Sequence, residues 1–314
     1  MSEKISAVIH ANNEEALLPR LFESLKGIDD IVLVDHTSTD GTAKLAKKLG
    51  ARVFTWDNVS EPVSNHDVME FEKRYGFTPT YKAGNRMPHF GTDRNNSMEQ
   101  ALHDWVFFPD CDEIVTWDLD KVKKLLPDND IVTCKFIHTR HPDGTEGETF
   151  TLPKLFRKSK VWWQGRLHEA IIGHGLRITH SDDMVINHYQ VPREHRQIYL
   201  PVMEFAMVRE ADTRLQYYLG REYFNYQMFE RAIQFLTIYL KTAYDTSEMV
   251  KAYIIIATSY WKLGDEDRAI GFCMQALKKD PSSKEALLFM ADISRPKDAR
   301  IWRKYASIDT SDIV

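Results

Sequence analysis

Four consecutive residues, Asp-Cys-Asp-Glu at 110–113, carry the side chains in this sequence that are best suited to chemistry. They follow an apolar run at 105–109, whose length and final proline predict a short buried strand. In an extended chain, Asp110 and Asp112 project on the same side, so both can face one ion or one ligand. Carboxylate oxygens are the ligands that Mg²⁺ and Mn²⁺ prefer, usually with substrate phosphates completing the shell. An exposed acidic turn gives the same short pattern, so the surrounding motifs must decide.

The elements that must position this stretch alternate between strands and helices from the N-terminus. The expected order is strand 5–9, helix 16–25, strand 30–35, helix 42–49 and strand 52–54. This order predicts a parallel sheet with crossover helices, in which ligands bind beyond the carboxyl ends of the strands. Asn13, Asp35 and Asp110 all follow predicted strands, which favours a site at that edge. Asn and Asp are also common caps and turn formers, which is the alternative.

A second stretch, residues 161–170, places two tryptophans beside a His-Glu pair. Glu169 near Trp162 and Trp163 would be partly desolvated, which raises the pKa of a carboxyl group toward values useful for a general base. The aromatic faces also suit stacking on a sugar ring. For one of the two tryptophans, however, packing in the core is the expected role.

Two further residues complete the set of candidates. Arg94 stands near the start of a helix predicted at 97–103, where a guanidinium and free backbone N–H groups suit a phosphate. His188 follows a short predicted strand. It is expected to be either a metal ligand or a hydrogen-bonded histidine near a domain junction.

Composition limits the classes of protein to which this chain can belong. The chain has 314 residues, of which 43% are hydrophobic and 28% charged, and this length suggests two domains. A net charge of −5 argues against the basic surface of a nucleic-acid binder. The three cysteines form neither a zinc pattern nor a disulfide framework, which favours a reducing, cytoplasmic setting. No apolar run is long enough to act as a signal or to span a bilayer, so we expect no integral membrane contact.

The sequence predicts one domain at 1–195 and a helical domain at 196–314. Within the first, residues 57–90 are polar and interrupted by Pro and Gly, so we expect an insertion or a lid. In the second, Tyr223 and Tyr260 belong to a pattern that recurs with an offset of 37 residues, near the tetratricopeptide period of about 34. Such arrays usually bind partners on a concave face. Bracing of the first domain, or formation of a homodimer, is an equally open role.

Taken in order, the motifs resemble a family-two glycosyltransferase with a GT-A fold and a C-terminal tetratricopeptide region. The resemblance covers most of the chain except residues 57–90. It is carried by Asn13-Glu14-Glu15, residues 34–42, Arg94-Asn95, residues 110–113, Leu167-His168-Glu169 and Asn187-His188-Tyr189. The fold that the resemblance implies is α/β: a GT-A Rossmann-like mixed sheet with flanking helices, followed by an all-α tetratricopeptide-like region.

The resemblance also implies roles on the donor side of the site. Asp35 resembles the residue that reads the nucleotide base, usually uracil. Asn13 and Glu14 resemble the loop under the nucleoside. Asp110 matches the first carboxylate of the motif, near the ribose and the metal, and Asp112 matches the carboxylate that ligates the metal.

On the acceptor side, Glu169 stands where such enzymes carry the general base. His188 resembles the C-terminal histidine that completes the metal coordination, and His168, beside the base, is a second catalytic candidate and a rival for that metal role. The sequence departs from the family pattern at His36 and Thr37, where a small residue or glycine is common. This departure bears on the identity of the donor rather than on the class of reaction.

We therefore expect a metal-dependent inverting glycosyltransferase that uses Mn²⁺ or Mg²⁺ and a nucleotide-sugar donor, UDP-linked in the first instance. The metal would neutralise charge on the leaving diphosphate. The acceptor is a saccharide first, a peptide second and a modified DNA base third. One alternative is a non-catalytic tetratricopeptide interaction protein with a degenerate first domain. Another is a nucleotidyltransferase, which would want a Gly-rich basic loop where the acidic residues 10–15 stand.

Overall fold

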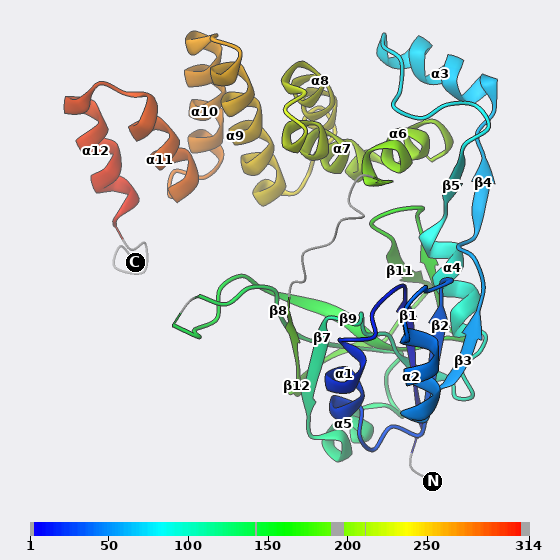
Figure 1. The fold of residues 1–314 in the computed structure, drawn as a ribbon. Helices are drawn as coiled ribbons and strands as arrows, with labels where there is room; N and C mark the ends of the chain where they lie inside the picture. The colour runs from blue at the N-terminus through cyan, green and yellow to red at the C-terminus, as the bar shows by residue number, and fades with distance from the viewer. Residues whose placement is uncertain (1–2, 142, 190–197, 211, 309–314) are drawn as a thin grey trace. The chain divides into compact units, whose positions relative to one another are not determined.

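The computed structural model describes residues 3–141, 143–189, 198–210 and 212–308. The chain divides into two compact units, one of residues 1–61 and 88–196 and one of residues 62–87 and 197–314 (Figure 1). Residues 62–87, most of the segment expected to be an insertion or a lid, thus group with the helical unit. That the first unit carries the catalytic site stays a prediction.

The first unit is built on a mixed eight-stranded sheet with the strand order β3-β2-β1-β6-β9-β8-β12-β7. Its strands are β1 (Ile5–Ala11), β2 (Asp30–Asp35), β3 (Arg52–Thr55), β6 (Trp105–Phe107), β7 (Glu113–Trp117), β8 (Ile131–Ile137), β9 (Thr149–Arg157) and β12 (Ile178–His188). β1 pairs in parallel with β2 and β6, and β2 pairs in parallel with β3, whereas β9 runs antiparallel to both β6 and β8. The predicted mixed sheet with flanking helices is confirmed.

Side chains that alternate along the strands of this sheet pack into two separate clusters of buried hydrophobic residues. Ile5, Ala7 and Ile9 of β1 are buried in one cluster, and Val8 is buried in the other. The helices that bury residues in the first cluster are α1 (Leu18–Ser24), α2 (Thr42–Lys48) and α5 (Leu119–Leu125). The second cluster receives residues from α4 (Phe90–Met98) and from β10 (Val161–Gln164) of a small two-stranded sheet with β11 (Ala170–Gly173). Because successive side chains of a strand point to opposite faces, both faces of the sheet are buried.

Helix α4 begins earlier than the sequence predicts. We expected a helix from residue 97, but α4 starts at Phe90, where the side chain of His89 accepts a hydrogen bond from the backbone N–H of Thr92. The imidazole cap satisfies one of the otherwise unpaired N–H groups of the first turn. Arg94 consequently lies inside the helix, in its second turn, rather than before it.

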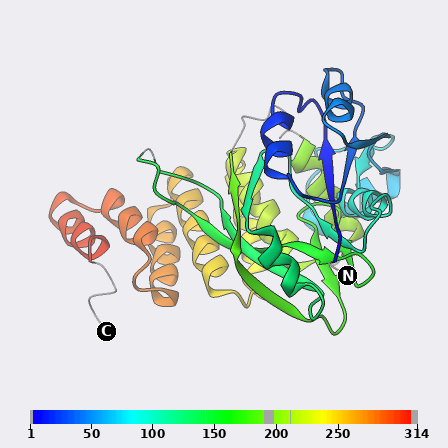
Figure 2. The same cartoon turned by 90° about the horizontal axis from the view of Figure 1, so that it is seen from below.

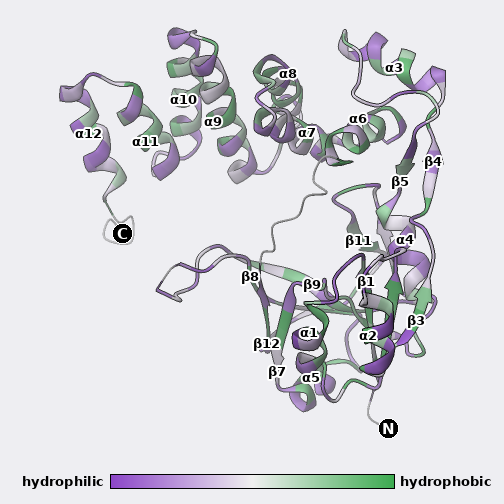
Figure 3. Cartoon of the chain, viewed as in Figure 1, coloured by the Kyte–Doolittle hydropathy of each residue, from purple (hydrophilic) through white to green (hydrophobic). Residues whose placement is uncertain are grey.

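The second unit contains only helices apart from the ends of the short ribbon β4 (Ser60–Pro62) and β5 (Arg86–Pro88), as far as the structure describes it. Its helices are α3 (Asn65–Tyr75), α6 (Tyr199–Arg209), α7 (Thr213–Asn225), α8 (Phe229–Tyr239), α9 (Thr246–Lys262), α10 (Glu266–Lys279), α11 (Lys284–Ile293) and α12 (Pro296–Ala306). Figures 1 and 2 both show α7 to α12 following one another in a row. Figure 3 shows hydrophilic and hydrophobic residues on the same helices, as in α9 and α10, which is typical of helices that bury one face.

Small residues allow close contact between these helices. A side chain at Gly220 would come within 2.6 Å of Leu236 Cγ, and Ala257 and Ala269 are fully buried. These positions belong to the repeat pattern in the sequence. The row of helical hairpins agrees with such a pattern, but the tetratricopeptide assignment itself stays a prediction.

Residues 62–87 are fixed within the helical unit by a buried carboxylate. Glu204 of α6 accepts hydrogen bonds from Thr80 N and Oγ1, at 2.6 and 2.5 Å, and from Tyr223 Oη at 2.5 Å. Burial raises the pKa of Glu204 despite these three hydrogen-bond donors. A second contact ties the segment to α6, since Arg209 Nε lies 2.8 Å from Asp67 Oδ1. The segment is therefore an ordered part of the second unit. Movement of this segment on ligand binding, as expected of a lid, stays a prediction.

Candidate active site

The loops after β1 and β2 are joined to each other by the amide of Asn13. The side-chain Oδ1 accepts hydrogen bonds from the backbone N–H groups of Thr39 and Asp40, at 2.8 and 3.3 Å. The backbone N–H of Asn13 donates to Ser38 Oγ at 2.8 Å. Asn13 adopts a φ of 58°, a left-handed conformation that Asn tolerates better than most residues. Asn13, which is predicted to belong to the loop under the nucleoside, thus holds the loops after β1 and β2 together.

Two neighbours of Asn13 extend this closure. Glu14 N donates to Thr42 Oγ1 at 2.8 Å, and Glu15 Oε2 accepts from Gly41 N at 2.8 Å. A Cβ at position 41 would lie 2.2 Å from Glu15 Oε1, so the approach of this carboxylate requires glycine there. The backbone N–H of Glu14 thus adds a second contact between the two loops.

Asp35 lies at the end of β2 and is 3% exposed. Its Oδ2 accepts a hydrogen bond from Ser38 N at 3.3 Å, whereas Oδ1 is buried and has no hydrogen-bond partner in the part of the chain that the structure describes. A buried acceptor without a partner is costly, and such atoms in native proteins call for a ligand or water donor. Asp35 thus lies at a carboxyl end of the parallel strands, and its role in reading a nucleotide base stays a prediction.

Arg94 connects two motifs that are far apart in the sequence. Its Nε donates a hydrogen bond to Glu169 Oε1, and its Nη2 lies 3.5 Å from Asp110 Oδ1. The guanidinium also stacks over the rings of Phe108 and Trp163, each 4.8 Å away. Burial lowers the pKa of Arg94, but the two carboxylates outweigh burial, so its net pKa is raised. The structure thus brings together the predicted base, the predicted phosphate-binding cation and the first aspartate of the acidic stretch.

The loop that carries Glu169 is held against α4 by backbone contacts. Asn95 Nδ2 donates to Trp163 O at 2.9 Å and Asn95 Oδ1 accepts from Trp163 N at 2.8 Å. Gly91 N donates to Gly165 O at 3.2 Å, and a Cβ at position 91 would lie 2.4 Å from that oxygen. These contacts fix the start of the loop from which Glu169 reaches Arg94.

Within the same loop, His168 directly precedes Glu169 and has a φ of 55°, a left-handed conformation that histidine, like asparagine and aspartate, adopts more often than most residues. The predicted role of His168 stays a prediction. Of the two tryptophans, Trp163 packs against Phe108 and Phe156 in the core, as expected for one of them. Trp162 is 40% exposed and lies against the ring of His174.

Lys154 and Glu113 form an ion pair beside Asp110, and the sequence analysis gave neither residue a role. Lys154 Nζ lies 2.7 and 2.8 Å from the two carboxylate oxygens of Glu113 and 3.8 Å from Asp110 Oδ2. Burial raises the pKa of Glu113 to about 7, an effect that Asp110 increases and Lys154 opposes. For Lys154, the carboxylates outweigh burial and raise the pKa. A lysine inside the apolar run of β9 was the available signal for this pair.

Asp112 and His188 meet at the ends of β7 and β12. His188 Nε2 lies 3.4 Å from Asp112 Oδ2, and its Nδ1 lies 3.3 Å from the carbonyl oxygen of His138. The hydrogen bond with Asp112 raises the pKa of His188, and burial opposes this effect. The rings of His138 and His188 are parallel within 6°, with centroids 5.1 Å apart. A carbonyl acceptor on Nδ1 leaves Nε2 as the nitrogen available to a metal.

The predicted metal ligands Asp110, Asp112 and His188 are not brought together as a set of three. Asp110 faces Arg94 and Lys154 instead. Across the described ranges, no three His, Cys, Asp or Glu residues are arranged to hold a metal ion. The Asp112–His188 pair nevertheless fits a divalent cation such as Mg²⁺ or Mn²⁺, because such ions are commonly held by few protein ligands together with substrate phosphates and water.

His10, which is partly buried, and His36, which is buried, form a further pair of side chains that was not among the predicted site residues. His10 Nε2 lies 2.6 Å from Ser97 Oγ, and the rings of His10 and His36 are 4.8 Å apart. Burial lowers the pKa of both histidines. His36 Nδ1 lies 3.3 Å from Trp56 O, and its buried Nε2 has no hydrogen-bond partner within the described ranges. The unusual residue after Asp35 is therefore a neutral core histidine.

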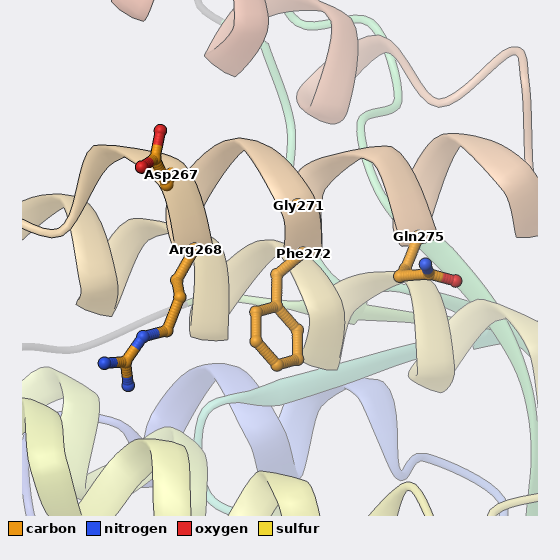
Figure 4. A pocket seen from close by; sticks show the side chains of 5 residues that line it. All are labelled: Asp267, Arg268, Gly271, Phe272 and Gln275. Atoms are coloured by element: carbon orange, nitrogen blue, oxygen red, sulfur yellow. The ribbon is translucent and has the colours of Figure 1, made fainter.

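A separate hollow of about 380 Å³ lies on α10 of the helical unit (Figure 4). It is lined by Asp267, Arg268, Gly271, Phe272 and Gln275. The guanidinium of Arg268 lies over the ring of Tyr260 at 5.0 Å and pairs with Asp265 at 2.8 Å. None of the five lining residues belongs to the group of side chains around Arg94 and Asp112, so the hollow is not part of the candidate active site.

Comparison with known proteins gives a match at the N-terminal part of the sheet. Residues 6–65 match the model of Glycosyl transferase family 2. An uncharacterised glycosyltransferase of Rickettsia conorii is 46% identical over 54 residues, which are 17% of this chain and 19% of that protein. The 4,4'-diaponeurosporenoate glycosyltransferase of Staphylococcus haemolyticus is 39% identical over 62 residues, 18% of this chain and 16% of that protein. The matches cover less than a fifth of these relatives, and they point to a glycosyltransferase.

Among solved structures, glucosyl-3-phosphoglycerate synthase of Mycobacterium tuberculosis, in complex with Mn²⁺, UDP and glucosyl-3-phosphoglycerate, aligns over 66% of this chain and 80% of that chain. The TM-score is 0.36 and the sequence identity 17%. Within the described residues, no helix is long and apolar enough to cross a membrane. The cytoplasmic setting stays a prediction.

Proposed function

We propose that the first unit is a metal-dependent inverting glycosyltransferase that moves a sugar from a nucleotide-sugar donor to a hydroxyl acceptor. The observation that carries the proposal is the bridge of Arg94 between Glu169 and Asp110. This bridge joins the candidate base to the acidic stretch, next to the Asp112–His188 pair. The family match at residues 6–65 supports the same reaction class.

The donor diphosphate is the group that the charged residues of the site suit. Asp112 and His188 would hold Mn²⁺ or Mg²⁺, which when bound neutralises negative charge on the phosphate oxygens. Arg94 and Lys154 add two positive charges within reach of the same acidic stretch. Cations placed where leaving-group charge develops lower the barrier for departure of the diphosphate.

The acceptor hydroxyl must lose a proton as it attacks, and Glu169 is the residue proposed to take it. The acceptor oxygen forms a bond to the anomeric carbon, the bond from that carbon to the phosphate oxygen breaks, and the electron pair leaves with the diphosphate. A single displacement of this kind inverts the anomeric configuration. The hydrogen bond from Arg94 to Glu169 Oε1 holds the carboxylate in place, and Oε2 is the proposed proton acceptor.

On the donor side, the buried unpaired oxygen of Asp35 supports recognition of a nucleotide base through an N–H donor. UDP-linked sugars are the first donors to test, because uracil offers one such N–H. The relative from Staphylococcus haemolyticus is named for 4,4'-diaponeurosporenoate, but its match covers only 18% of this chain and 16% of that protein. We therefore rank acceptors as before: a saccharide, then a peptide, then a modified DNA base.

Release of nucleoside diphosphate from nucleotide sugars tests this proposal without a known acceptor, because water replaces the acceptor in slow donor hydrolysis. We expect Mn²⁺-dependent release from one nucleotide sugar and loss of that release in Asp112→Asn. The released sugar should have the inverted anomeric configuration by NMR. Equal release by wild type and Asp112→Asn would refute the mechanism as proposed.

The second candidate is a non-catalytic protein in which the helical unit binds a partner. The hollow on α10, with Arg268 and Phe272 in its lining, is the observation that favours it. A peptide bound there, together with failure to bind any nucleotide, would support this alternative. A homodimer formed through the helical unit remains a further proposal, tested by the oligomeric state of the full chain in solution.

A further inference from the structure

One face of α10 carries apolar side chains that the helical unit leaves exposed. This exposed face consists of Asp267, Ile270, Gly271, Met274 and Lys278, which recur at helical spacing. Ile270 and Met274 are 40% and 46% exposed. The side of α10 that packs into the unit buries Ala269, Cys273 and Ala276 completely. The two exposed apolar residues are therefore neighbours on a surface of the helix that the core of the unit does not use.

Gly271 leaves a notch in the middle of the exposed face. A Cβ at position 271 would meet no described atom within 4 Å outside its own stretch of helix, so the unit has room for a larger side chain there. Glycine inside a helix weakens it relative to alanine, and packing within the unit does not account for this glycine. Gly271 also lines the hollow described above, together with Phe272 and Gln275. The notch therefore gives a side chain of another molecule access to the hollow (Figure 4).

Charges of opposite sign stand at the two ends of the exposed face. Asp267 lies in the first turn of α10 and Lys278 in the last, about three turns away along the same side. Neither side chain has an ion pair or a hydrogen bond with any residue that the structure describes. Glu266 and Lys279 beside them repeat the two signs. The exposed face is thus acidic at one end, apolar in the middle and basic at the other end.

We propose that the exposed face of α10 is the contact of a homodimer in which the α10 helices of two copies lie antiparallel across a twofold axis. A twofold axis places each residue opposite the one at the same distance on its other side. With the axis between residues 272 and 273, Asp267 lies opposite Lys278 of the second copy. Gly271 then lies opposite Met274 of the second copy, whose flexible side chain enters the notch.

The pattern of the exposed face favours a second copy over a partner of different sequence. Reversed in direction, the face is complementary to itself, because its acidic end meets its basic end and its notch meets a projecting side chain. A parallel arrangement would instead place Asp267 against Asp267 and Lys278 against Lys278, and like charges disfavour association. Each contact occurs twice in the antiparallel dimer, so one substitution in the chain changes two contacts.

Exchange of charges tests the antiparallel pairing. Sedimentation equilibrium of the full chain measures the dissociation constant of the dimer, at low ionic strength because salt screens exposed charges. Asp267→Lys places a lysine opposite Lys278 of the second copy, and Lys278→Glu places a glutamate opposite Asp267. We expect each variant alone to have a dissociation constant at least about tenfold higher than that of wild type. An equimolar mixture of the two variants should form a heterodimer about as tight as the wild-type dimer, because both ion pairs are restored.

The mixture separates a lost contact from a damaged helix. The reversed charges also oppose the dipole of α10, which weakens the helix in each variant. Mixing cannot repair that defect, whereas it restores both ion pairs of an antiparallel contact. A mixture that stays monomeric under conditions in which wild type is dimeric would overturn the proposed packing.

Two further variants test the middle of the exposed face. Ile270→Glu and Gly271→Gln both change exposed positions, so the thermal midpoint of the monomer should stay close to that of wild type. We expect both to abolish the dimer, the first by placing a charge in the apolar contact and the second by filling the notch. Ile301→Glu on α12 is the matched control, since Ile301 is 51% exposed and lies outside this face, and it should dimerise like wild type. Equal loss in Ile301→Glu would indicate general association through exposed apolar residues and contradict the proposal.

This inference goes beyond the proposed sugar transfer and does not rest on it, so the two can fail separately. A wild-type chain that stays monomeric throughout the micromolar range would overturn the contact on α10 and return the hollow to the peptide-binding alternative. The same result would leave the transfer reaction untouched, because release of nucleoside diphosphate measures that reaction independently. A wild-type dimer that all α10 variants preserve would likewise overturn the contact.

Discussion

Two parts of the candidate site are built in different ways. The loops after β1 and β2 are joined by hydrogen bonds among residues 13–15 and 38–42, and most of these bonds use the backbone. The side that holds Arg94, Asp110 and Lys154 is assembled from charged side chains that come from α4, β9 and the loop before β7. The first part, the cradle, is joined largely through backbone groups, and the second, the network, is joined through pairs of opposite charge. We therefore expect changes in the network to affect turnover and changes in the cradle to affect donor binding.

The largest expected effect is that of Glu169→Gln. Glutamine keeps the shape and can still accept a hydrogen bond from Arg94, but it cannot take a proton, so transfer should fall about 10²–10⁴-fold while nucleotide binding is retained. Donor turnover and nucleotide affinity measured side by side check this split. Glu3→Gln, in a Glu–Arg pair with Arg157, is the matched control and should leave transfer unchanged. Equal turnover in Glu169→Gln and wild type would remove Glu169 from the mechanism.

Arg94→Lys should have the next largest effect. Lysine keeps the charge but lacks the planar fork that reaches Glu169 and Asp110 together, so we expect kcat to fall roughly 10²-fold. Steady-state kinetics measures this change. The matched control is Arg52→Lys, since Arg52 forms a two-contact pair with Asp30. A similar loss in both variants would indicate general destabilisation instead of a role for Arg94 in the site.

Asn13→Ala should change donor binding more than turnover. It removes the hydrogen bonds that join the two loops and places alanine at a φ of 58°, so the KM for the donor should rise and unfolding should cost about 1–2 kcal/mol less. Asn13→Gly tolerates that φ and separates the two causes. If Asn13→Ala lowers kcat instead and leaves KM unchanged, the cradle and the network are not independent.

The smallest expected effect on activity is that of Asp130→Asn. Asp130 pairs with Arg177 outside the candidate site, so this ion pair should contribute to folding stability and not to transfer. Hydrogen bonds from the side chain and backbone of Arg177 lower the pKa of Asp130 to about 2, below the ordinary value of about 3.9. A depressed folded-state pKa contributes stability above pH 4 that is lost as the pH falls toward 2. The thermal midpoints of wild type and Asp130→Asn should therefore converge as the pH falls from about 5 to about 2, with transfer at neutral pH unaltered. A constant gap in midpoint over this range would contradict the assigned pKa.

The sequence indicated where the candidate site lies because several of its residues stand at strand ends. Asp35 ends β2, and Asn13 and Asp110 closely follow β1 and β6, which pair in parallel, and that position indicates a ligand edge. Arg94 and Glu169 were found through their residue types and neighbours. Their direct contact was not predicted, because it spans 75 residues and depends on how α4 packs against the loop after β10.

The network and the helical unit were harder to predict. Lys154 reaches Glu113 and Asp110 because β9 runs antiparallel beside β6, a pairing that no local pattern in the sequence indicates. Residues 62–87 are held in the helical unit by Glu204, which accepts a hydrogen bond from Thr80, 124 positions earlier in the sequence. A buried carboxylate in an otherwise apolar helix was the available signal, but its partner could not be read from spacing.

The most direct test of the central claim is the thermal midpoint of unfolding with UDP, GDP, CDP and TDP, each with and without Mn²⁺. A nucleotide that binds only the folded protein raises the midpoint by mass action. We predict a Mn²⁺-dependent rise with one of the four nucleotides, and we predict that Asp112→Asn abolishes it. A midpoint unchanged by all four nucleotides would contradict a nucleotide-sugar glycosyltransferase and favour a partner-binding role for the helical unit.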